Sequence, residues 1–233
     1  HCFSTAEHGN IFDFVMKTQN LKFGEAVKHL ANLAGMRPYT FSKEDQIREE
    51  KWNNYKLIFN KYVEHYHKEL LKNSLAIEAK NYLKKRGLTI EEVKKFKIGF
   101  ETNDINFQEN IFKEFKESEI KETGLFYFDE KKKQYVSRFR ERVLFPIKNI
   151  SGEPIAIGGR ILKDNKYFAK YINSPETQFF KKGSNLYNLD LARKLSNKID
   201  HIYLVEGYMD VVGLSKNGIE NVVANLGTSL TDK

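Results

Sequence analysis

The sequence predicts an α+β protein with a helical N-terminal region, a mixed-sheet part and, at its end, the first strand–helix–strand portion of an α/β fold. Three observations predict this class. Apolar residues recur at helical spacing over much of the segment before residue 100. Short runs rich in Phe, Tyr, Val and Ile begin at residue 125, and residues 201–227 alternate between strand-like and helix-like patterns.

The composition is that of a folded protein. At 233 residues, 40% of them hydrophobic, the chain can bury the core of one large domain or two small ones. No run approaches the roughly 18 apolar residues that a membrane-spanning helix needs, so we expect no membrane role. The chain starts at His1 without a secretory leader, which favours a fragment of a cytoplasmic protein, and the single Cys2 excludes an intrachain disulfide.

The charge balance is basic, with 39 Lys and Arg against 31 Asp and Glu and a formal net charge of +8. Such a balance is typical of proteins that bind polyanions. A Lys-rich composition also arises from solubility or genome-wide residue bias, so charge alone leaves nucleic-acid binding open.

The first module is expected to hold two short amphipathic helices, because apolar residues cluster at 11–15 and recur at helical spacing over 23–34. Pro38 then interrupts the pattern. We place this module at residues 1–36 and a linker at residues 37–43.

The next segment, residues 41–72, is charged and lacks Gly and Pro, which predicts one long helix. A further helix is expected to end at Gly87, and Thr89 with Glu92 has the spacing of a reciprocal capping box that begins another. These two helices should form a compact hairpin. The stripe by which the long helix would pack is expected to comprise Leu57, Ile58, Tyr62, His65, Tyr66, Glu69 and Leu70.

Strands are expected after residue 125, where polar turns at 129–133, 149–153 and 163–166 separate the apolar runs of a partly antiparallel sheet. Residues 201–227 then predict a parallel βαβ unit.

Two carboxylates mark the first turn of this unit. Glu206 directly follows an apolar run, so we expect it at the carboxyl end of a buried parallel strand, where ligands and metals collect in open α/β sheets. Asp210 lies four residues later, and both carboxylates could face one Mg²⁺-sized site. The alternative is that Asp210 only complements the helix dipole and Glu206 is exposed. Tyr208, between them, either packs under this site or is an ordinary core aromatic.

A resemblance narrows these possibilities. Residues 205–231, VEGYMDVVGLSKNGIENVVANLGTSLT, resemble the first half of a Toprim domain, the fold shared by bacterial primases, topoisomerases and some nucleases. Two preceding stretches are similar to the segment before Toprim in DnaG-type bacterial primases, which topoisomerases lack: RFRERVLFPIKNISGEPIAIGGRIL and KYINSPETQFFKKGSNLYNL. The similarity is ordered from about Ala79 to Thr231. It implies an N-terminal subdomain of the primase RNA polymerase domain at residues 44–200 and a truncated Toprim domain at residues 201–233.

Primases of this family copy single-stranded DNA into short RNA primers from ribonucleoside triphosphates, with Mg²⁺ or Mn²⁺ held by carboxylates, and work with a replicative helicase. The resemblance implies that Glu206 and Asp210 are metal ligands and that, with Arg160 and Lys170, they are catalytic positions. The family's next ligands form an Asp-x-Asp motif that the chain does not contain, and Asp232 lies too close to the preceding turn to replace it. We therefore expect an incomplete metal site and no polymerase activity from this chain alone.

The resemblance also assigns a template and nucleotide groove. It gives basic positions at Arg142, Arg160, Lys170 and Lys182, and it lets Asn173 orient a base, a sugar or a neighbouring loop. The alternative for each cation is a solvated surface charge. Gly158 and Gly159 permit close backbone approach. Base stacking is open to Tyr167, Phe168, Tyr171, Phe179 and Phe180, but a core position is expected for most of them.

Residues 1–31, HCFSTAEHGNIFDFVMKTQNLKFGEAVKHLA, resemble the last third of the primase zinc ribbon. Cys2 matches the third zinc ligand, whereas the fourth position falls on Thr5, whose hydroxyl is a poor Zn²⁺ ligand. His1 and His8 could in principle compensate, but His1 directly precedes Cys2, and His8 is not at a ligand position of the family. The resemblance thus implies Zn²⁺ in the family, and Thr5 argues against it in this chain.

Two other functions stay open. One is a non-catalytic module that binds single-stranded DNA, which Thr5 favours, and the other is a different Toprim enzyme. Glu206 and Asp210 favour an enzyme, because a binding module needs no paired carboxylates beside its basic groove.

Overall fold

The structure is a computed structural model, and it describes residues 9–36, 42–163, 167–195 and 200–227. The chain forms two compact units, His1–Glu49 and Glu50–Lys233. The division falls inside the long helix α3 (Lys43–Lys72), whereas most of the expected linker at 37–43 lies outside the described residues. The domain bounds inferred from the sequence stay a prediction.

The first unit contains helices α1 (Ile11–Gln19) and α2 (Phe23–Leu33), where the apolar spacing predicts them. The side chain of Asn10 accepts a hydrogen bond from the second backbone N–H of α1 at 2.8 Å and so caps this helix. Val15 and Ala26 are the buried side chains of the two helices.

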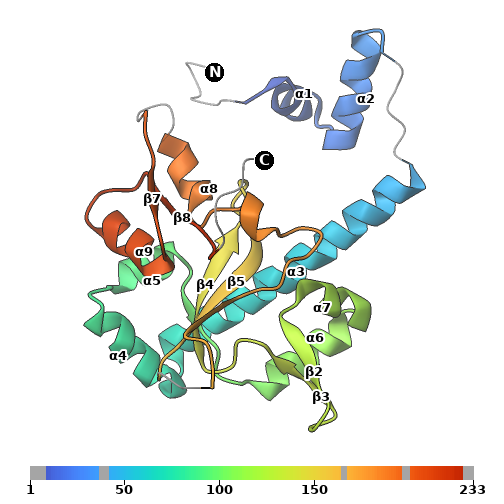
Figure 1. The fold of residues 1–233 in the computed structure, drawn as a ribbon. Helices are drawn as coiled ribbons and strands as arrows, with labels where there is room; N and C mark the ends of the chain where they lie inside the picture. The colour runs from blue at the N-terminus through green and yellow to red at the C-terminus, as the bar shows by residue number, and fades with distance from the viewer. Residues whose placement is uncertain (1–8, 37–41, 164–166, 196–199, 228–233) are drawn as a thin grey trace. The chain divides into compact units, whose positions relative to one another are not determined.

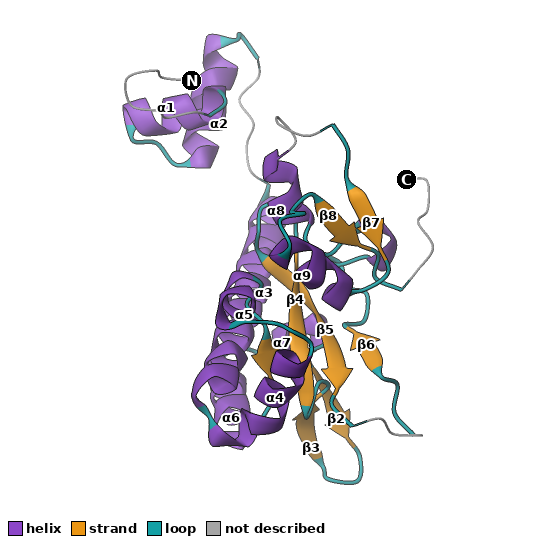
Figure 2. Ribbon diagram, turned by 90° about the vertical axis from the view of Figure 1, so that its left-hand side faces the viewer, coloured by secondary structure: helices purple, strands orange, loops and turns teal. Residues whose placement is uncertain are grey.

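The second unit is built along α3, which runs beside strands β4 (Arg142–Lys148) and β5 (Pro154–Ile161) in Figures 1 and 2. The buried residues of α3 are Tyr55, Ile58, Phe59, Tyr62, Val63, Tyr66, His67 and Leu70. The stripe expected from the sequence is wrong at Leu57, which is 50% exposed. The buried face advances in steps of three and four from Tyr55, and Leu57 lies outside those steps.

A four-stranded antiparallel sheet lies next to α3, in the order β1-β4-β5-β6. Its outer strands are β1 (Gly99–Phe100) and β6 (Tyr171–Asn173). The expected turn at 149–153 connects β4 to β5, and the turn at 129–133 connects a separate hairpin of β2 (Phe126–Asp129) and β3 (Gln134–Ser137).

The predicted helical hairpin is confirmed in α4 (Ile77–Lys85) and α5 (Ile90–Lys95). Gly87 follows α4 with φ of 79°, a left-handed conformation that favours glycine. Thr89 donates its backbone N–H to Glu92 Oε2 at 2.7 Å and accepts at its hydroxyl from a first-turn N–H, so the capping box forms.

Two helices that the sequence pattern did not reveal, α6 (Ile105–Glu114) and α7 (Glu117–Thr123), follow β1. Asp104 caps α6 by accepting the backbone N–H of Phe107 at 3.1 Å. Shorter helical pieces complete the second unit: η1 (Ser74–Ala76), η2 (Lys182–Ser184), α8 (Leu189–Ala192) and η3 (Arg193–Leu195).

The chain then forms the predicted parallel βαβ unit from β7 (Tyr203–Val205), α9 (Tyr208–Lys216) and β8 (Val222–Ala224). β8 is buried, but β7 is not the buried strand that we expected, because Tyr203 and Leu204 are each 47% exposed. In the described residues β7 pairs with β8 alone, which leaves its other side uncovered.

These elements confirm the predicted α+β class. Among the helices that the structure describes, none is long and apolar enough to cross a membrane.

Candidate functional site

Arg160 is one of two buried cations of the expected groove. It lies on β5 opposite Tyr171 of β6, and its guanidinium carbon is 4.0 Å from the ring centroid of Tyr82 in α4 and 5.8 Å from that of Tyr171. Only 5% of Arg160 is exposed, and its Nε is buried without a hydrogen-bond partner within the described part of the chain. Arg160 is therefore a cation fixed between aromatic rings, not a solvated surface charge.

Arg142 lies on the neighbouring strand and faces protein instead of solvent. Its Nη1 donates to the carbonyl oxygens of Ala169 at 3.0 Å and Lys170 at 3.3 Å. Burial lowers the pKa of the Arg142 guanidinium. The contacts assign Arg142 a positioning role, since they hold the backbone of the segment that carries Lys170.

This segment precedes β6 and is exposed at its side chains. Lys170 is exposed, and its carbonyl accepts the backbone N–H of Ile161 at 3.0 Å. Tyr167 is 91% exposed and Phe168 60%. We name Tyr167, Phe168, Lys170 and Tyr171, together with Arg160 opposite Tyr171, the aromatic–basic strip.

The expectation that most of the candidate stacking residues are core is wrong for three of the five. Tyr167 and Phe168 are exposed, and Tyr171 is 41% exposed, because β6 is an edge strand. Phe180 is fully buried and Phe179 packs on Tyr55 at a centroid distance of 4.8 Å, so these two are core.

Asn173 joins the strip to the βαβ unit. Its Oδ1 accepts the hydroxyl of Tyr208 at 2.5 Å and its Nδ2 donates to the carbonyl of Leu226 at 2.9 Å. Tyr208 stacks on Phe145 at 5.2 Å, and burial raises the pKa of its hydroxyl, which keeps it a donor. Tyr208 is thus a core aromatic at the start of α9.

Glu206 lies in the connection between β7 and α9, Asp210 lies in the first turn of α9, and both are exposed. Asp210 Oδ2 accepts the backbone N–H of Gly207 at 3.1 Å. This hydrogen bond and the position in the first turn of α9 agree with the alternative considered from the sequence, in which Asp210 complements the helix dipole. Oxygen donors suit Mg²⁺ or Mn²⁺. Within the described ranges, however, no third His, Cys, Asp or Glu completes a cluster with this pair.

The remaining site residues expected from the sequence lie elsewhere or outside the described residues. Lys182 is in η2, where its backbone N–H donates to Glu176 Oε1 at 3.0 Å, on a different segment from the aromatic–basic strip. The expected zinc position Cys2 and its neighbour Thr5 lie outside the described residues, as does Asp232.

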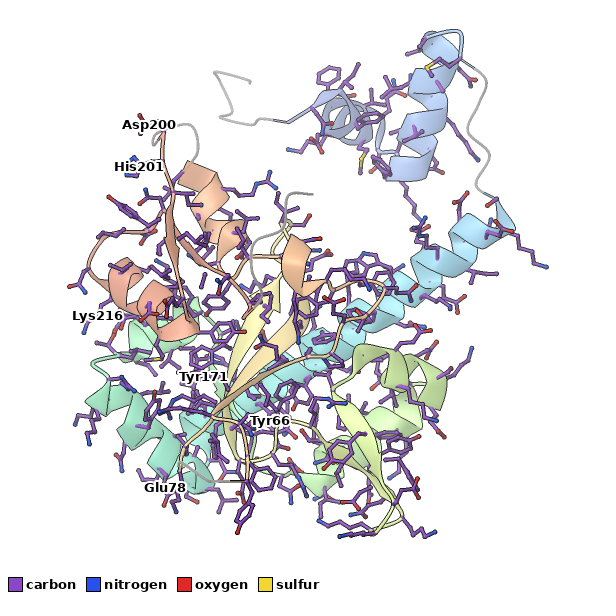
Figure 3. The ribbon with its side chains drawn as sticks, in the orientation of Figure 1. Tyr66, Glu78, Tyr171, Asp200, His201 and Lys216 are labelled. Carbon is purple, nitrogen blue, oxygen red and sulfur yellow. The ribbon has the colours of Figure 1, made fainter. Side chains whose placement is uncertain are left out.

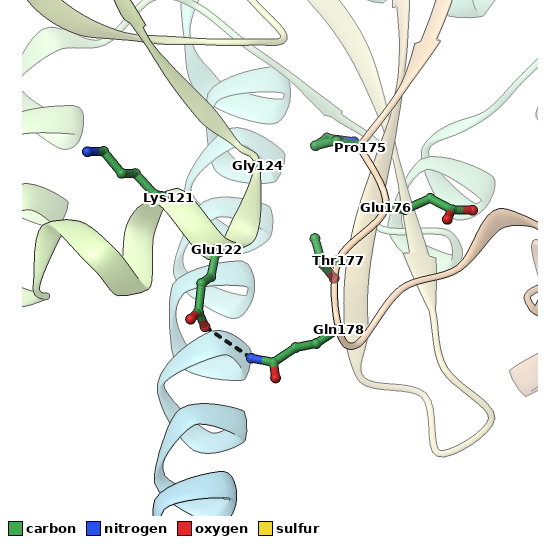
Figure 4. A pocket seen from close by; sticks show the side chains of 7 residues that line it. All are labelled: Lys121, Glu122, Gly124, Pro175, Glu176, Thr177 and Gln178. Atoms are coloured by element: carbon green, nitrogen blue, oxygen red, sulfur yellow. Dashed lines mark hydrogen bonds between the residues drawn. The ribbon is translucent and has the colours of Figure 1, made fainter.

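The loop after β6 is anchored on both sides. Ser174 Oγ accepts the backbone N–H of Ile157 at 2.9 Å, and Pro175 packs against Gly124, which has φ of 65°. A pocket of about 330 Å³ lies between this loop and α7, and Gln178 Nε2 donates to Glu122 Oε2 at 3.1 Å. Figure 4 shows the residues that line this pocket and the bond between these two side chains. These contacts fix the end of the strand that carries Asn173.

The βαβ unit is also tied to the α4–α5 hairpin. Lys216, at the end of α9, donates to the carbonyl of Gly87 (Figure 3), and Lys95 Nζ lies 2.7 Å from Glu220 Oε1. These contacts hold α9, whose first turn carries Asp210, against the α4–α5 hairpin. Sequence reasoning missed Tyr82, whose role depends on the docking of α4 against β5 and leaves no local signal.

Comparison with family models matches residues 66–193 to the DNA primase catalytic core, N-terminal domain, residues 200–233 to a Toprim domain and residues 1–46 to a CHC2 zinc finger. The DNA primase of Clostridium acetobutylicum is 40% identical over 237 residues, which cover 99% of this chain and 38% of that protein.

Solved structures agree with these matches. A structure of the DnaG primase catalytic domain bound to ssDNA aligns with a TM-score of 0.69 and 35% identity, over 78% of this chain and 56% of that one. The Aquifex aeolicus primase, with zinc-binding and RNA polymerase domains, aligns with a TM-score of 0.69 and 32% identity, over 96% of this chain and 53% of that one.

Proposed function

The chain belongs to the bacterial DNA primase family, and we propose that it is the part of such an enzyme that holds the single-stranded DNA template beside the first carboxylates of the catalytic centre. In the whole protein this activity would be RNA primer synthesis from ribonucleoside triphosphates, in partnership with a replicative helicase. The chain spans about two fifths of the curated relatives that it matches, with 38% and 40% of the first two.

The observation that carries the proposal is the aromatic–basic strip. Exposed aromatic rings stack on bases without regard to sequence, and cations beside them attract the phosphate backbone. Tyr167 and Phe168 are exposed next to Lys170, and the guanidinium of Arg160 lies against the rings of Tyr82 and Tyr171. Within the described part of the chain, the buried Nε of Arg160 has no hydrogen-bond partner.

We assign metal binding to Glu206 and Asp210. When bound, Mg²⁺ or Mn²⁺ would neutralise triphosphate charge and lower the pKa of the attacking hydroxyl. The chain's own residues orient this turn, since Tyr208 anchors the start of α9 to Asn173 and the cap of Asp210 fixes its carboxylate. We also assign the zinc ribbon of the family to residues 1–36, with Thr5 as an argument against Zn²⁺ in this chain.

The strip makes a first testable prediction. Fluorescence anisotropy with a labelled single-stranded oligonucleotide should show weak binding whose log affinity falls with log salt, by about 0.7 for each phosphate neutralised. Tyr167→Ala should weaken binding by roughly fivefold or more, because stacking contributes about 1 to 3 kcal/mol per base. Lys170→Ala should reduce the salt slope.

Matched controls come from the β2–β3 hairpin. Phe128, which is 41% exposed, and Lys132, which is exposed, provide an aromatic and a cation away from the strip. Phe128→Ala and Lys132→Ala should leave affinity nearly unchanged. If all four variants weaken binding equally, DNA binding does not depend on the location of these side chains, and the assignment of the binding site to the strip is wrong.

A further inference from the structure

Three potential metal ligands meet where α3 approaches the start of α6. His65 and Glu69 lie one turn apart on α3, and Asp104 caps α6. One ligand atom from each lies within 4.8 Å of the other two. All three residues are half-buried, and none belongs to the site assigned above.

The imidazole of His65 is held in place and presents a nitrogen to this cluster. Its ring stacks on Phe107 at 3.8 Å with an interplanar angle of 2°, and its Nε2 lies 3.1 Å from Asp104 Oδ2. An imidazole nitrogen is among the commonest protein ligands of divalent transition metals.

Both carboxylates are oriented by other groups. Glu69 Oε2 accepts from Asn73 Nδ2 at 2.6 Å and from Thr102 Oγ1 at 2.7 Å, while Asp104 Oδ1 accepts the backbone N–H of Phe107. These bonds use Oε2 of Glu69 and Oδ1 of Asp104, so the other oxygen of each carboxylate can bind a metal ion. Such outer-shell donors are typical of metal centres, where they fix the direction of the ligand atoms.

We propose that His65, Glu69 and Asp104 bind a divalent transition-metal ion of the zinc class, which joins α3 to α6. One imidazole nitrogen with two carboxylate oxygens is a donor set that suits Zn²⁺ and leaves a position for water. Ligands at about 2.1 Å from a tetrahedral ion lie roughly 3.4 Å apart, so the side chains would have to close slightly on binding. This site is independent of the proposed polymerase centre, and its role would be structural.

The test uses this chain with Cys2→Ser, which removes the lone thiolate as a competing ligand. Calorimetric titration with ZnCl₂ should show binding at one site, and visible spectra with Co²⁺ should report nitrogen and oxygen ligands. His65→Phe keeps a ring to stack on Phe107, and Asp104→Asn keeps the acceptor that caps α6. Each should weaken Zn²⁺ binding at least tenfold without loss of helical circular dichroism.

An exposed pair provides the matched control. His201 Nδ1 lies 2.9 Å from Asp200 Oδ1, and Figure 3 shows both residues well away from Tyr66, the neighbour of His65 in α3. His201→Phe and Asp200→Asn should leave the affinity unchanged. Zn²⁺ should also raise the melting temperature of the Cys2→Ser chain but not of the two site variants. Absence of binding by the Cys2→Ser chain, or equal affinity in the His65→Phe and Asp104→Asn chains, would overturn the proposal.

Discussion

Glu101 shows how a single residue holds the second unit together. Its side chain is fully buried, and it accepts hydrogen bonds from the hydroxyl of Tyr66 at 3.1 Å and from the backbone N–H groups of Asn103 at 3.2 Å and Glu141 at 3.1 Å. Glu141 has φ of 55°, a left-handed conformation rarely adopted outside glycine. The carboxylate therefore helps to fix the turn before β4, at the cost of burying an ionisable group.

Burial raises the pKa of Glu101 above its ordinary value, despite the donors around it. The native state then holds a proton that the unfolded state has lost, so the free energy of unfolding should fall as pH rises from about 4.3 through the raised pKa. In Glu101→Gln this fall should be absent. Urea unfolding between pH 4 and 8 tests the prediction, with exposed Glu130→Gln as control. Parallel pH profiles for the wild type and Glu101→Gln would contradict it.

For single residues, the sequence indicated which side chains belong to the candidate site but not how buried they are. The resemblance marked Arg142 and Arg160 as groove cations, yet both are 5% exposed. Their surroundings depend on how β4, β5 and β6 align, and long-range register leaves no trace in a local pattern. Tyr167 and Phe168 are exposed for a different reason: they lie in the segment before β6, whereas aromatic side chains are more often buried than not.

Among the elements, those with local signals were predicted and those defined by tertiary contact were not. Thr89 with Glu92 marked the start of α5, because a capping box is readable within four residues. α6 and α7 are short, and their stability depends on packing more than on their own sequence. The exposure of β7 was unpredictable because a strand's burial depends on its neighbours, whatever its own apolar content.

The docking of α9 on the sheet gives an element-scale prediction. A Cβ added at Gly158 of β5 would lie 2.4 Å from Cζ of Tyr208, a ring already confined by Phe145 and Tyr187. Gly158→Ala should therefore destabilise the protein by about 1 to 3 kcal/mol. Gly213, inside α9, has open space around it, and Gly213→Ala should be neutral or stabilising by up to about 1 kcal/mol.

Chemical denaturation measures both variants. Because Tyr208 also donates to Asn173, the Gly158→Ala variant should lose affinity for single-stranded DNA as well. A Gly158→Ala protein as stable as the Gly213→Ala protein would show that α9 does not pack on β5 in this way.

For the whole molecule, we expect DNA binding and RNA synthesis to depend on different parts of the protein. The aromatic–basic strip is assembled within the second unit, whereas Glu206 and Asp210 have no third ligand in the described residues. Binding of template should therefore be measurable with this chain, and synthesis should require the rest of a full-length relative. A non-catalytic DNA-binding module would bind template, but its full-length form would not synthesise RNA.

The corresponding prediction uses a chain extended to the length of its relatives, for which we expect ribonucleotide incorporation on single-stranded template with Mg²⁺ or Mn²⁺. Glu206→Gln keeps the shape of the side chain but removes an anionic ligand, which should cost several kcal/mol in the transition state and on the order of a thousandfold in rate. Asp210→Asn keeps an acceptor for the N–H of Gly207, so its loss should be smaller. DNA affinity should be unchanged in both variants. Near-normal synthesis by the extended Glu206→Gln protein would refute the metal assignment, and an inactive extended wild type would favour the non-catalytic module.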